Sequence, residues 1–361
     1  MTAPDAGTDD EVAPDGGTAD ATDTSGLTGD VSRLEESLAS IERAQLIGRA
    51  LLVLGIVGLL VAQTVGMTFL GFTLAEVVSQ LPRFFENITD FLSPDFHFVT
   101  LYAVEQGLHG WSALFGSFAN PGSLLESVLN RDQGLTIVGG AVTTIVIGIT
   151  GTVLGFPLAL LFGVLGSERV VPYPFNFIFR GTMSTIRSIP ALVWVLIYVP
   201  LVGINPVGAM LAIGTDTVGN LGRLFTDELE EIEEGPIEAI SSTGASSPQT
   251  VVFGMLSQVS SSFVAWTLYI LEINVRIAVS LGVVGAGGLG QYVKGRLSLL
   301  AFDQAAAGLL MVIVIVLSVE LVSSRLRARL RPGEHDGKSL VQTVQDLLDG
   351  GKWMGTGGTK K

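Results

Sequence analysis

The sequence has no cysteine and carries little charge. Without cysteine, disulfides, thiolate metal sites and cysteine nucleophiles are excluded. The three histidines, His97, His109 and His335, show no metal-ligand spacing. Charged residues make up only 15% of the chain, whereas soluble globular domains contain about 25%. Apolar residues make up 48% and the mean hydropathy is +0.55, so we expect the chain to lie in a lipid bilayer.

Apolar runs long enough to cross a membrane recur along the chain. A helix needs about 20 such residues to span a hydrocarbon layer about 30 Å thick. The predicted spans are residues 46–67, 136–165, 186–202, 207–225, 259–284 and 305–322. The predicted fold class is therefore all-α, a polytopic membrane protein with about six transmembrane helices and both termini on one side.

The distribution of charge orients the chain. The first 30 residues contain eight acidic and no basic residues, which predicts a solvated, disordered tail and no signal peptide. Basic residues in short loops stay in the cytosol, and they cluster after the second and sixth spans, at Arg169, Arg180, Arg187, Arg325, Arg327, Arg329 and Arg331. Both termini are therefore expected to be cytoplasmic.

This orientation divides the chain into five parts. They are an acidic cytosolic tail (1–45), a first transmembrane helix (46–68), an extracellular segment (69–133), a transmembrane core (134–330) with a cytosolic loop at 226–258, and a cytosolic tail (331–361). In the extracellular segment, Leu81–Phe85 and Phe91–Pro94 predict an interfacial helix and a turn.

The end of the fourth span carries six carboxylates between Asp227 and Glu234. Both the helix dipole and the positive-inside bias disfavour them there. Two interpretations remain open, a solvated loop and a surface that faces a partner.

A short helix, a turn and a second helix are predicted after this acidic run. Pro236 suits the first position of a helix, and 237–243 then forms about two turns. Gly244 suits the left-handed residue that closes a helix, and Ser247-Pro248 can cap and open the next helix. Such a short helix is marginal alone, so it is expected to need a partner.

This segment resembles the signature of ABC importer permeases, which is Glu-Ala-Ala, three residues, Gly, nine residues and a hydrophobic-x-Leu-Pro ending. The chain has Glu238-Ala239-Ile240 and Gly244 at the right offset. Ile240, Gly254 and Ser257 replace the second alanine, the hydrophobic residue and the proline. Longer stretches resemble the phosphonate and phosphate-type permeases: Arg187–Trp194, Gly222–Pro236, Glu272–Arg276 and Gly282–Gly290.

The resemblance, which covers about 130–325, implies a type I ABC importer permease (MetI-like) fold and a transport subunit rather than an enzyme. It implies a two-fold dimer of permeases, an extracellular binding protein that delivers a phosphonate or related phosphorus oxyanion, and no nucleic acid. The chain itself would bind no cofactor, because ATP and Mg belong to a separate cytosolic ATPase. That ATPase would dock on Pro236, Ile237, Glu238, Ala239, Ile240, Thr243, Gly244, Ala245, Ser246 and Ser247.

Two glycine-rich motifs suggest nucleotide binding but fail in context. Gly285-x-Gly287-x-x-Gly290 matches a dinucleotide fingerprint, but a membrane-length run precedes it and the stretch some 20 residues on is Ala and Leu rather than a ribose-binding acid. We therefore interpret Gly285, Gly287, Gly288 and Gly290 as a closely packed gate loop. Gly337-Lys338-Ser339 resembles the end of a P-loop, but Pro332 stands where the first glycine is required.

Ionisable groups at bilayer depth cost about 2.5 to 3.5 kcal/mol each on insertion scales. The candidate pathway residues are Arg187, Asp216, Asn220, Glu272, Asn274 and Arg276. Glu272 and Arg276 can form an i,i+4 ion pair; alternatively, Arg276 guides an oxyanion together with Asn274. Arg187 is expected to snorkel at the cytosolic end of the third span.

Two other classes of function are possible. A secondary transporter or channel would use Asp216, Glu272 and Arg276 as an ion relay, but the sequence shows no internal repeat. A membrane-embedded enzyme would need a metal cluster or nucleophile constellation, and neither is visible. Five lysines among 20 basic residues and a pI near 4.6 resemble the composition of proteins from salt-loving archaea.

Overall fold

The structure is a computed structural model that describes residues 24–129 and 136–330, with side chains from Arg43 onward. These residues form helices and turns and contain no strand, which confirms the all-α fold class. The first part of the predicted acidic tail and the whole of the predicted C-terminal tail (331–361) lie outside the described residues. The chain divides into two compact units, Met1–Pro82 and Arg83–Lys361.

The first unit contains one long helix, α1 (Thr24–Phe69). Its stretch Arg43–Phe69 is long and apolar enough to cross a membrane, and none of it is buried by protein. The helix starts well before the predicted span at residue 46, so the prediction of a disordered tail is wrong for residues 24–45. The reason is that this stretch is rich in Leu, Glu, Ala and Arg, which are strong helix formers.

Helix α2 (Leu74–Leu92) follows and runs through Pro82 into the second unit. It has no buried residue, and apolar side chains recur along it at helical spacing. It ends at Leu92, just before Pro94, because the residue before a proline disfavours helical backbone angles. The predicted helix and turn are thus confirmed, whereas their interfacial location stays a prediction.

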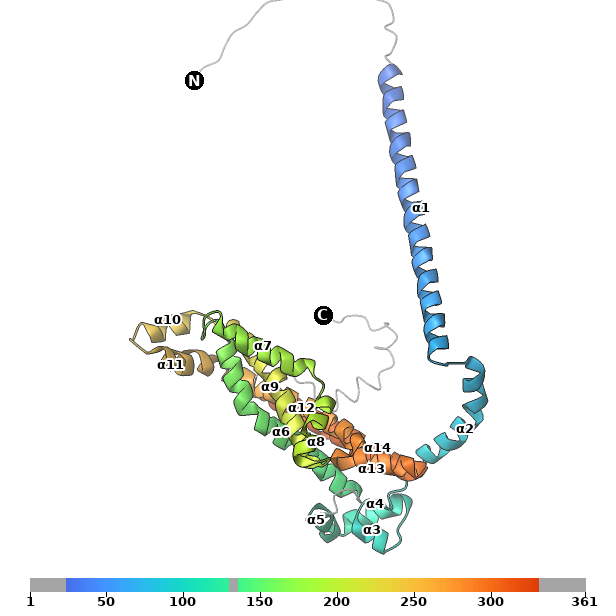
Figure 1. The fold of residues 1–361 in the computed structure, drawn as a ribbon, viewed down its shortest axis with the longest axis vertical. Helices are drawn as coiled ribbons and strands as arrows, with labels where there is room; N and C mark the ends of the chain where they lie inside the picture. The colour runs from blue at the N-terminus through green and yellow to red at the C-terminus, as the bar shows by residue number, and fades with distance from the viewer. Residues whose placement is uncertain (1–23, 130–135, 331–361) are drawn as a thin grey trace, which may run out of the picture. The chain divides into compact units, whose positions relative to one another are not determined.

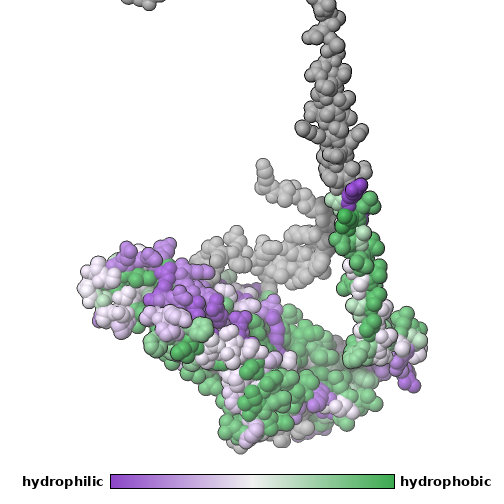
Figure 2. Space-filling model, turned by 45° about the horizontal axis from the view of Figure 1, so that its top comes forward, coloured by the Kyte–Doolittle hydropathy of each residue, from purple (hydrophilic) through white to green (hydrophobic). Residues whose placement is uncertain are grey.

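The second unit is a helix bundle (Figure 1). Its helices are α6 (Ile137–Gly166), α7 (Phe175–Ser188), α8 (Ala191–Val202), α9 (Pro206–Glu230), α12 (Leu256–Leu281) and α14 (Phe302–Leu330). Figure 2 shows apolar residues over one side of this unit and polar residues gathered toward one end. This distribution suits a bundle whose side faces lipid.

The α6 and α9 helices form the central pair, and glycines let their backbones approach. A Cβ atom at Gly155 would lie 2.4 Å from the carbonyl oxygen of Gly214, which is far inside van der Waals contact. Small residues at helix crossings are the usual means of close packing in membranes, where lipid supplies no hydrophobic drive between helices. These contacts bury most of α9.

The predicted spans are only partly matched by the helices. Within the described residues, four helices are long and apolar enough to cross a membrane: Arg43–Phe69, Ile137–Gly166, Ser247–Ala286 and Phe302–Leu330. The 25-residue helix α9 is not among them because it is polar, and burial inside the bundle removes its need to face lipid.

The third predicted span, 186–202, is wrong as a single helix. α7 ends at Ser188 and α8 begins at Ala191, and the two meet at 92°. Ile189 has extended backbone angles (φ −98°, ψ 116°), as expected for a residue that precedes a proline. The pair has the length and composition of a broken span or of a re-entrant loop, and it adds a fifth crossing to the count if its two parts are taken as one span.

Short helices lie at the two ends of the bundle (Figure 1). At one end are α10 (Gly235–Ser241), α11 (Ser247–Gln249) and a π-helical turn, η1 (Thr250–Met255). At the other end is the cap, which we define as residues 95–129, with α3 (Leu101–Glu105), α4 (Gly110–Ala119) and α5 (Pro121–Leu129). A second π-helical turn, η2 (Gly282–Ala286), leads into α13 (Gly288–Ser298).

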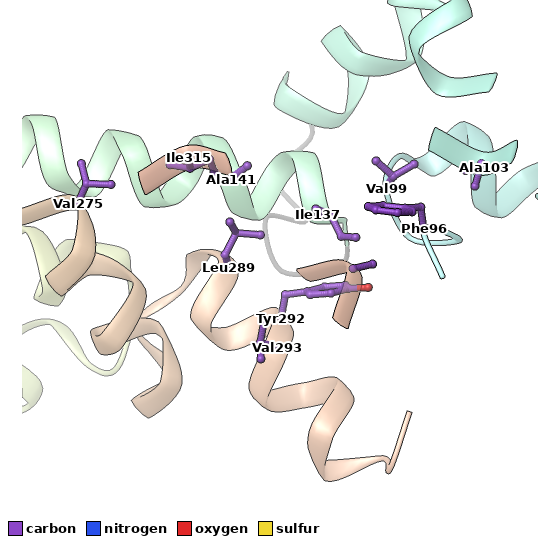
Figure 3. Packing of buried hydrophobic residues seen from close by; sticks show 12 residues of the cluster. Phe96, Val99, Ala103, Ile137, Ala141, Val275, Leu289, Tyr292, Val293 and Ile315 are labelled. Carbon is purple, nitrogen blue, oxygen red and sulfur yellow. The ribbon is translucent and has the colours of Figure 1, made fainter. Parts of the chain in front are cut away.

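The cap is held to the bundle by a shared apolar core (Figure 3). Phe96 and Val99 of the cap pack in one cluster with Ile137 of α6 and with Leu289 and Tyr292 of α13. Backbone hydrogen bonds reinforce this core, since the N–H of Ile137 donates to the carbonyl of Phe98 at 2.8 Å. The cap is therefore a fixed part of the second unit.

The close approach of α6 and α9 predicts that Gly155→Ala destabilises the protein. The added methyl group would meet backbone atoms that cannot rotate away, and overpacking of this kind costs about 1–3 kcal/mol. Gly181→Ala in α7 is the matched control, because no neighbouring atom lies within 4 Å of its added Cβ. Thermal unfolding in detergent should show a lower Tm for Gly155→Ala alone. Equal Tm values for both variants would contradict the packing.

Candidate functional site

The segment after α9 forms the predicted helix, turn and helix. Helix α10 carries Pro236 in its first turn and lies at the end of the bundle away from the cap. Gly244 has φ +82°, the left-handed conformation that was expected of it. The predicted helix at 237–243 is observed at Gly235–Ser241, so its type is confirmed and its ends differ by two residues.

The N-cap residue of α11, the second helix of this segment, differs by one position from the prediction. Ser246, not Ser247, is the N-cap of α11, and its backbone N–H donates to Oε1 of Gln249 at 2.8 Å. The pattern Ser-x-x-Gln at Ser246–Gln249 is a known N-terminal signal. The sequence therefore contained the information that would have identified the correct residue.

The α10 segment, which we define as residues 235–247, presents most of the predicted contact residues to solvent. Pro236, Glu238, Ala239, Thr243, Gly244, Ser246 and Ser247 are exposed, while Ile237, Ile240 and Ala245 are half-buried. A cavity of about 530 Å³ lies beside α10 and is lined by residues that include Arg169, Glu234 and Glu238. The segment is thus an exposed, supported projection.

Two departures from the permease signature are in contact. Ile240 stands where the signature has alanine, and buried Gly254 stands where it has a hydrophobic residue. A Cβ atom built on Gly254 would lie 3.4 Å from Cδ1 of Ile240. The larger side chain on α10 therefore occupies the space that the glycine of η1 leaves free, and the two changes compensate each other.

The acidic run at the end of α9 is largely occupied by contacts within the bundle. Asp227 pairs with Arg223 at 3.0 Å, and Glu230 pairs with Arg180 of α7. Glu228 accepts a hydrogen bond from the indole N–H of Trp266 in α12 at 2.8 Å. Glu228 and Glu230 thus clamp the end of α9 to α12 and α7, whereas Asp227 pairs along α9 itself. Neither earlier interpretation included this clamp.

The remaining three carboxylates are exposed, at Glu231, Glu233 and Glu234. They lie between the clamp and α10, so the two earlier interpretations remain open for them alone. This division explains how the end of α9 tolerates an unfavourable acidic run. The carboxylates that lie within α9 are the ones for which a partner is described.

Three of the candidate pathway residues come together at the break between α7 and α8. A Cβ atom on Gly219 would lie 2.8 Å from the backbone nitrogen of Arg187, so the end of α7 presses against the middle of α9. Asp216 lies one turn earlier on α9, and its Oδ2 accepts a hydrogen bond from Nδ2 of Asn220 at 3.0 Å. Arg187 is therefore at a helix break beside α9, not at the cytosolic end of a straight span as expected.

A cavity of about 560 Å³ opens beside this break. It is lined by Pro190, Ala191, Leu192, Asp216, Ile277, Ser280, Leu281, Val283 and Val284. Only 8% of Asp216 is exposed, and among the described residues no basic side chain forms an ion pair with it. The charge of Arg187 acts on it from a greater distance. The cavity wall is thus apolar apart from one carboxylate and one hydroxyl.

Glu272 and Arg276 form the predicted ion pair on α12. The pair extends to α14, where Arg327 lies 3.2 Å from Glu272 and Glu320 lies 3.2 Å from Arg276. Sequence reasoning missed these two partners. Glu320 and Arg327 are seven residues apart and share one helix face, and this spacing was the available signal.

Asn274 does not join Arg276. Its Nδ2 donates to Thr152 of α6 at 2.8 Å and to Thr217 of α9 at 2.9 Å, and only 1% of the residue is exposed. Residues two apart on a helix point in nearly opposite directions. The described geometry therefore does not assemble the oxyanion pair that was one of the two interpretations.

The glycine-rich stretch makes a tight junction between α12 and α13. Gly285, Gly287 and Gly288 have φ values of 101°, 94° and 73°, a backbone conformation that residues with a side chain rarely adopt. The backbone N–H of Leu289 donates to Oγ1 of Thr144 in α6 at 2.9 Å. Close backbone packing, as expected for these glycines, is thus observed, whereas a gating role stays a prediction.

Comparison with known families decides the class of protein. Residues 151–334 match the family described as "Binding-protein-dependent transport system inner membrane component". The chain belongs to this family. It is a multi-pass membrane transport subunit of the permease type and not an enzyme, and the exposed α10 segment lies within the matched region.

Curated relatives include two bacterial permeases. The chain is 32% identical over 198 residues to the "Phosphate-import permease protein PhnE" of Mycolicibacterium smegmatis, covering 55% of this chain and 37% of that protein. It is 30% identical over 191 residues to the "Phosphite transport system permease protein PtxC" of Stutzerimonas stutzeri, covering 53% of this chain and 70% of that protein. The chain therefore spans well under half of the mycobacterial relative.

A solved structure titled "Inward facing conformations of the MetNI methionine ABC transporter: CY5 native crystal form" is also similar. The two chains are 22% identical in sequence, and their superposition has a TM-score of 0.48. The match covers 54% of this chain and 95% of that chain.

The contact between Ile240 and Gly254 predicts a compensating pair of substitutions. Ile240→Ala removes three carbons from the contact and Gly254→Val adds three, so each change alone should loosen α10 by about 1–3 kcal/mol. The destabilisation of the double variant should be smaller than the sum of the two single effects by at least about 1 kcal/mol, as expected for residues in contact. Protease sensitivity of the α10 segment measures this.

The matched control is Ala239→Val combined with Gly254→Val. Ala239 is exposed on the same helix, so its substitution should neither loosen the segment nor rescue Gly254→Val. Additive effects of Ile240→Ala and Gly254→Val would show that the two positions do not compensate each other.

Proposed function

We propose that the chain is the permease subunit of an ATP-driven importer and that α10 docks on a separate ATPase subunit. The observation that carries the proposal is the position of the signature residues. Glu238, Ala239 and Gly244 lie exposed on a short helix and its turn, at the end of the bundle away from the cap. A seven-residue helix is marginal in water, so a groove on a partner would complete it.

The clamp at the end of α9 supports a mechanical role for this contact. Glu228 and Glu230 hold the last turn of α9 to α12 and α7, and α10 follows a few residues later. A displacement of α10 would therefore be passed to α9 rather than absorbed by a flexible loop. Closure of paired ATPases would then tilt the bundle helices, a motion of the shear or hinge type.

The assembly that we propose contains two copies of this chain, two ATPase subunits that bind ATP and Mg, and an external binding protein. The α10 end and both termini face the cytosol in this arrangement, because the basic residues that flank short loops favour that side. The cap then faces outward, where a binding protein delivers the substrate.

The substrate that we propose is a phosphonate or related phosphorus oxyanion, since the curated relatives are named for phosphate and phosphite transport. The pathway runs past the break between α7 and α8, where Arg187 offers donors. A guanidinium matches the geometry of phosphorus oxyanions, and broken helices commonly line transport sites. The glycine-rich junction Gly285–Gly290 closes this pathway at the cap end.

An ion-driven secondary transporter receives less support from the geometry. Its relay would need Asp216, Glu272 and Arg276 in one chain of contacts. Glu272 and Arg276 instead pair with α14, whereas Asp216 contacts Asn220 near the break between α7 and α8.

Docking through α10 predicts a selective effect of Gly244→Val. A β-branched residue at φ +82° is strained by about 1–3 kcal/mol, so the turn should open and ATPase association should weaken about tenfold. Gly235→Val is the matched control, because this residue is also exposed at an end of α10 but has no positive φ. Co-purification of the ATPase with membrane-inserted permease measures the effect. Undiminished association of Gly244→Val would sink the docking assignment.

A further inference from the structure

One face of α4 in the cap exposes three large aromatic side chains. Trp111, Phe115 and Phe118 are 53%, 67% and 59% exposed, and their spacing places them along a single stripe of the helix. Ala113 and Ser117 on the opposite face are buried against the rest of the cap. Helix α4 contains no charged residue, so this stripe is not a typical water-facing surface.

The next helix has the same character. On α5, Leu125 and Leu129 are 60% and 71% exposed, and Glu126 is its one charged residue. A net charge of −14 shows that the chain has acidic residues in excess, yet these two helices outside the spans expose apolar groups instead. An apolar environment therefore fits this side of the cap better than water does.

The depth of the cap follows from the length of α6. Thirty residues make this helix about 45 Å long, as long as a bilayer is thick when its headgroup layers of both leaflets are included. When a helix of this length crosses along the bilayer normal, its first turns lie in a headgroup layer. The cap is bonded to those turns, because the N–H groups of Ile137 and Val138 donate to Phe98 and Val99.

The exposure pattern along α6 agrees with this depth. The first exposed large side chain of α6 is Val146, about 14 Å along the helix from Ile137. Earlier side chains are covered, in part by the cap and α13 through the core that contains Ile137 and Ala141. The cap thus lies beside the interfacial turns of a spanning helix, at the level where bilayers favour aromatic side chains.

We propose that α4 lies in the membrane interface on the cap side, with Trp111, Phe115 and Phe118 inserted at the boundary between headgroups and acyl chains. Interfacial helices bury their apolar face about 5–10 Å deep. Leu125 and Leu129 of α5 extend the same contact. The occupant of this face is the bilayer in which the protein already lies.

A binding protein or a second copy fits the face less well. A binding protein docks and departs, so its landing surface must be stable in water between encounters, and such interfaces are no more apolar than ordinary protein surface. Lipid is always present beside α6, whose exposed side chains Val146, Ile149 and Val153 face it. In the proposed position the aromatic stripe continues that apolar surface outward.

The absence of cysteine makes a direct test possible. A nitroxide label is attached to a single cysteine in the full chain, introduced as Phe115→Cys, Phe118→Cys or Leu125→Cys, and the protein is reconstituted with its ATPase in lipid vesicles. Collision with oxygen reports lipid, and collision with a water-soluble nickel chelate reports solvent. At all three positions we expect the label to collide with oxygen severalfold more often than with the nickel chelate. Gln106→Cys, an exposed polar site in the same cap, is the control and should favour the nickel chelate.

The alternatives give different results. Dominant nickel collision at positions 115 and 118 would place the stripe in water and overturn the proposal. Shielding from both reagents would mean that protein covers it, either a second copy or another part of the chain. Shielding that appears only when the external binding protein is added would make the stripe a docking surface. Measurement at three positions guards against a single label that disturbs folding.

Discussion

The close contact between α6 and α9 is the constraint on which the rest of the structure depends. At Gly155 and Gly214 the two backbones come so near that no side chain fits between them. This contact lets α9 be polar at bilayer depth, because its hydroxyls, Asp216 and Asn220 are surrounded by other helices rather than by lipid. The features proposed for function, namely the break beside Asp216, the acidic clamp and α10, are all positioned by this one helix.

Features set by local sequence were predicted well. The helix that starts near Pro236, the left-handed turn at Gly244 and the i,i+4 pair of Glu272 and Arg276 each depend on residues a few positions apart, and all three are observed. The family resemblance extended this local prediction to a class of protein, and the family match confirms that class.

Features set by tertiary packing were not predicted. The disposition of Asn274 toward Thr152 and Thr217, and the role of Glu228 beside Trp266, require knowledge of which helices are neighbours. Periodicity gives the face of a helix but not the partner that the face meets, which is why the clamp remained invisible in the sequence. One further miss was local: apolar composition suggested a straight span over 186–202, although Pro190, at the 92° break, was visible in the sequence.

The most direct test of the proposed importer is uptake into vesicles. Vesicles are prepared with this chain alone, with the chain and its ATPase, and with both plus the external binding protein, and each is offered a labelled phosphonate, phosphate or phosphite. We expect uptake of a phosphorus oxyanion only in the complete system and only with ATP. Uptake driven by an ion gradient in vesicles that contain this chain alone would contradict the account.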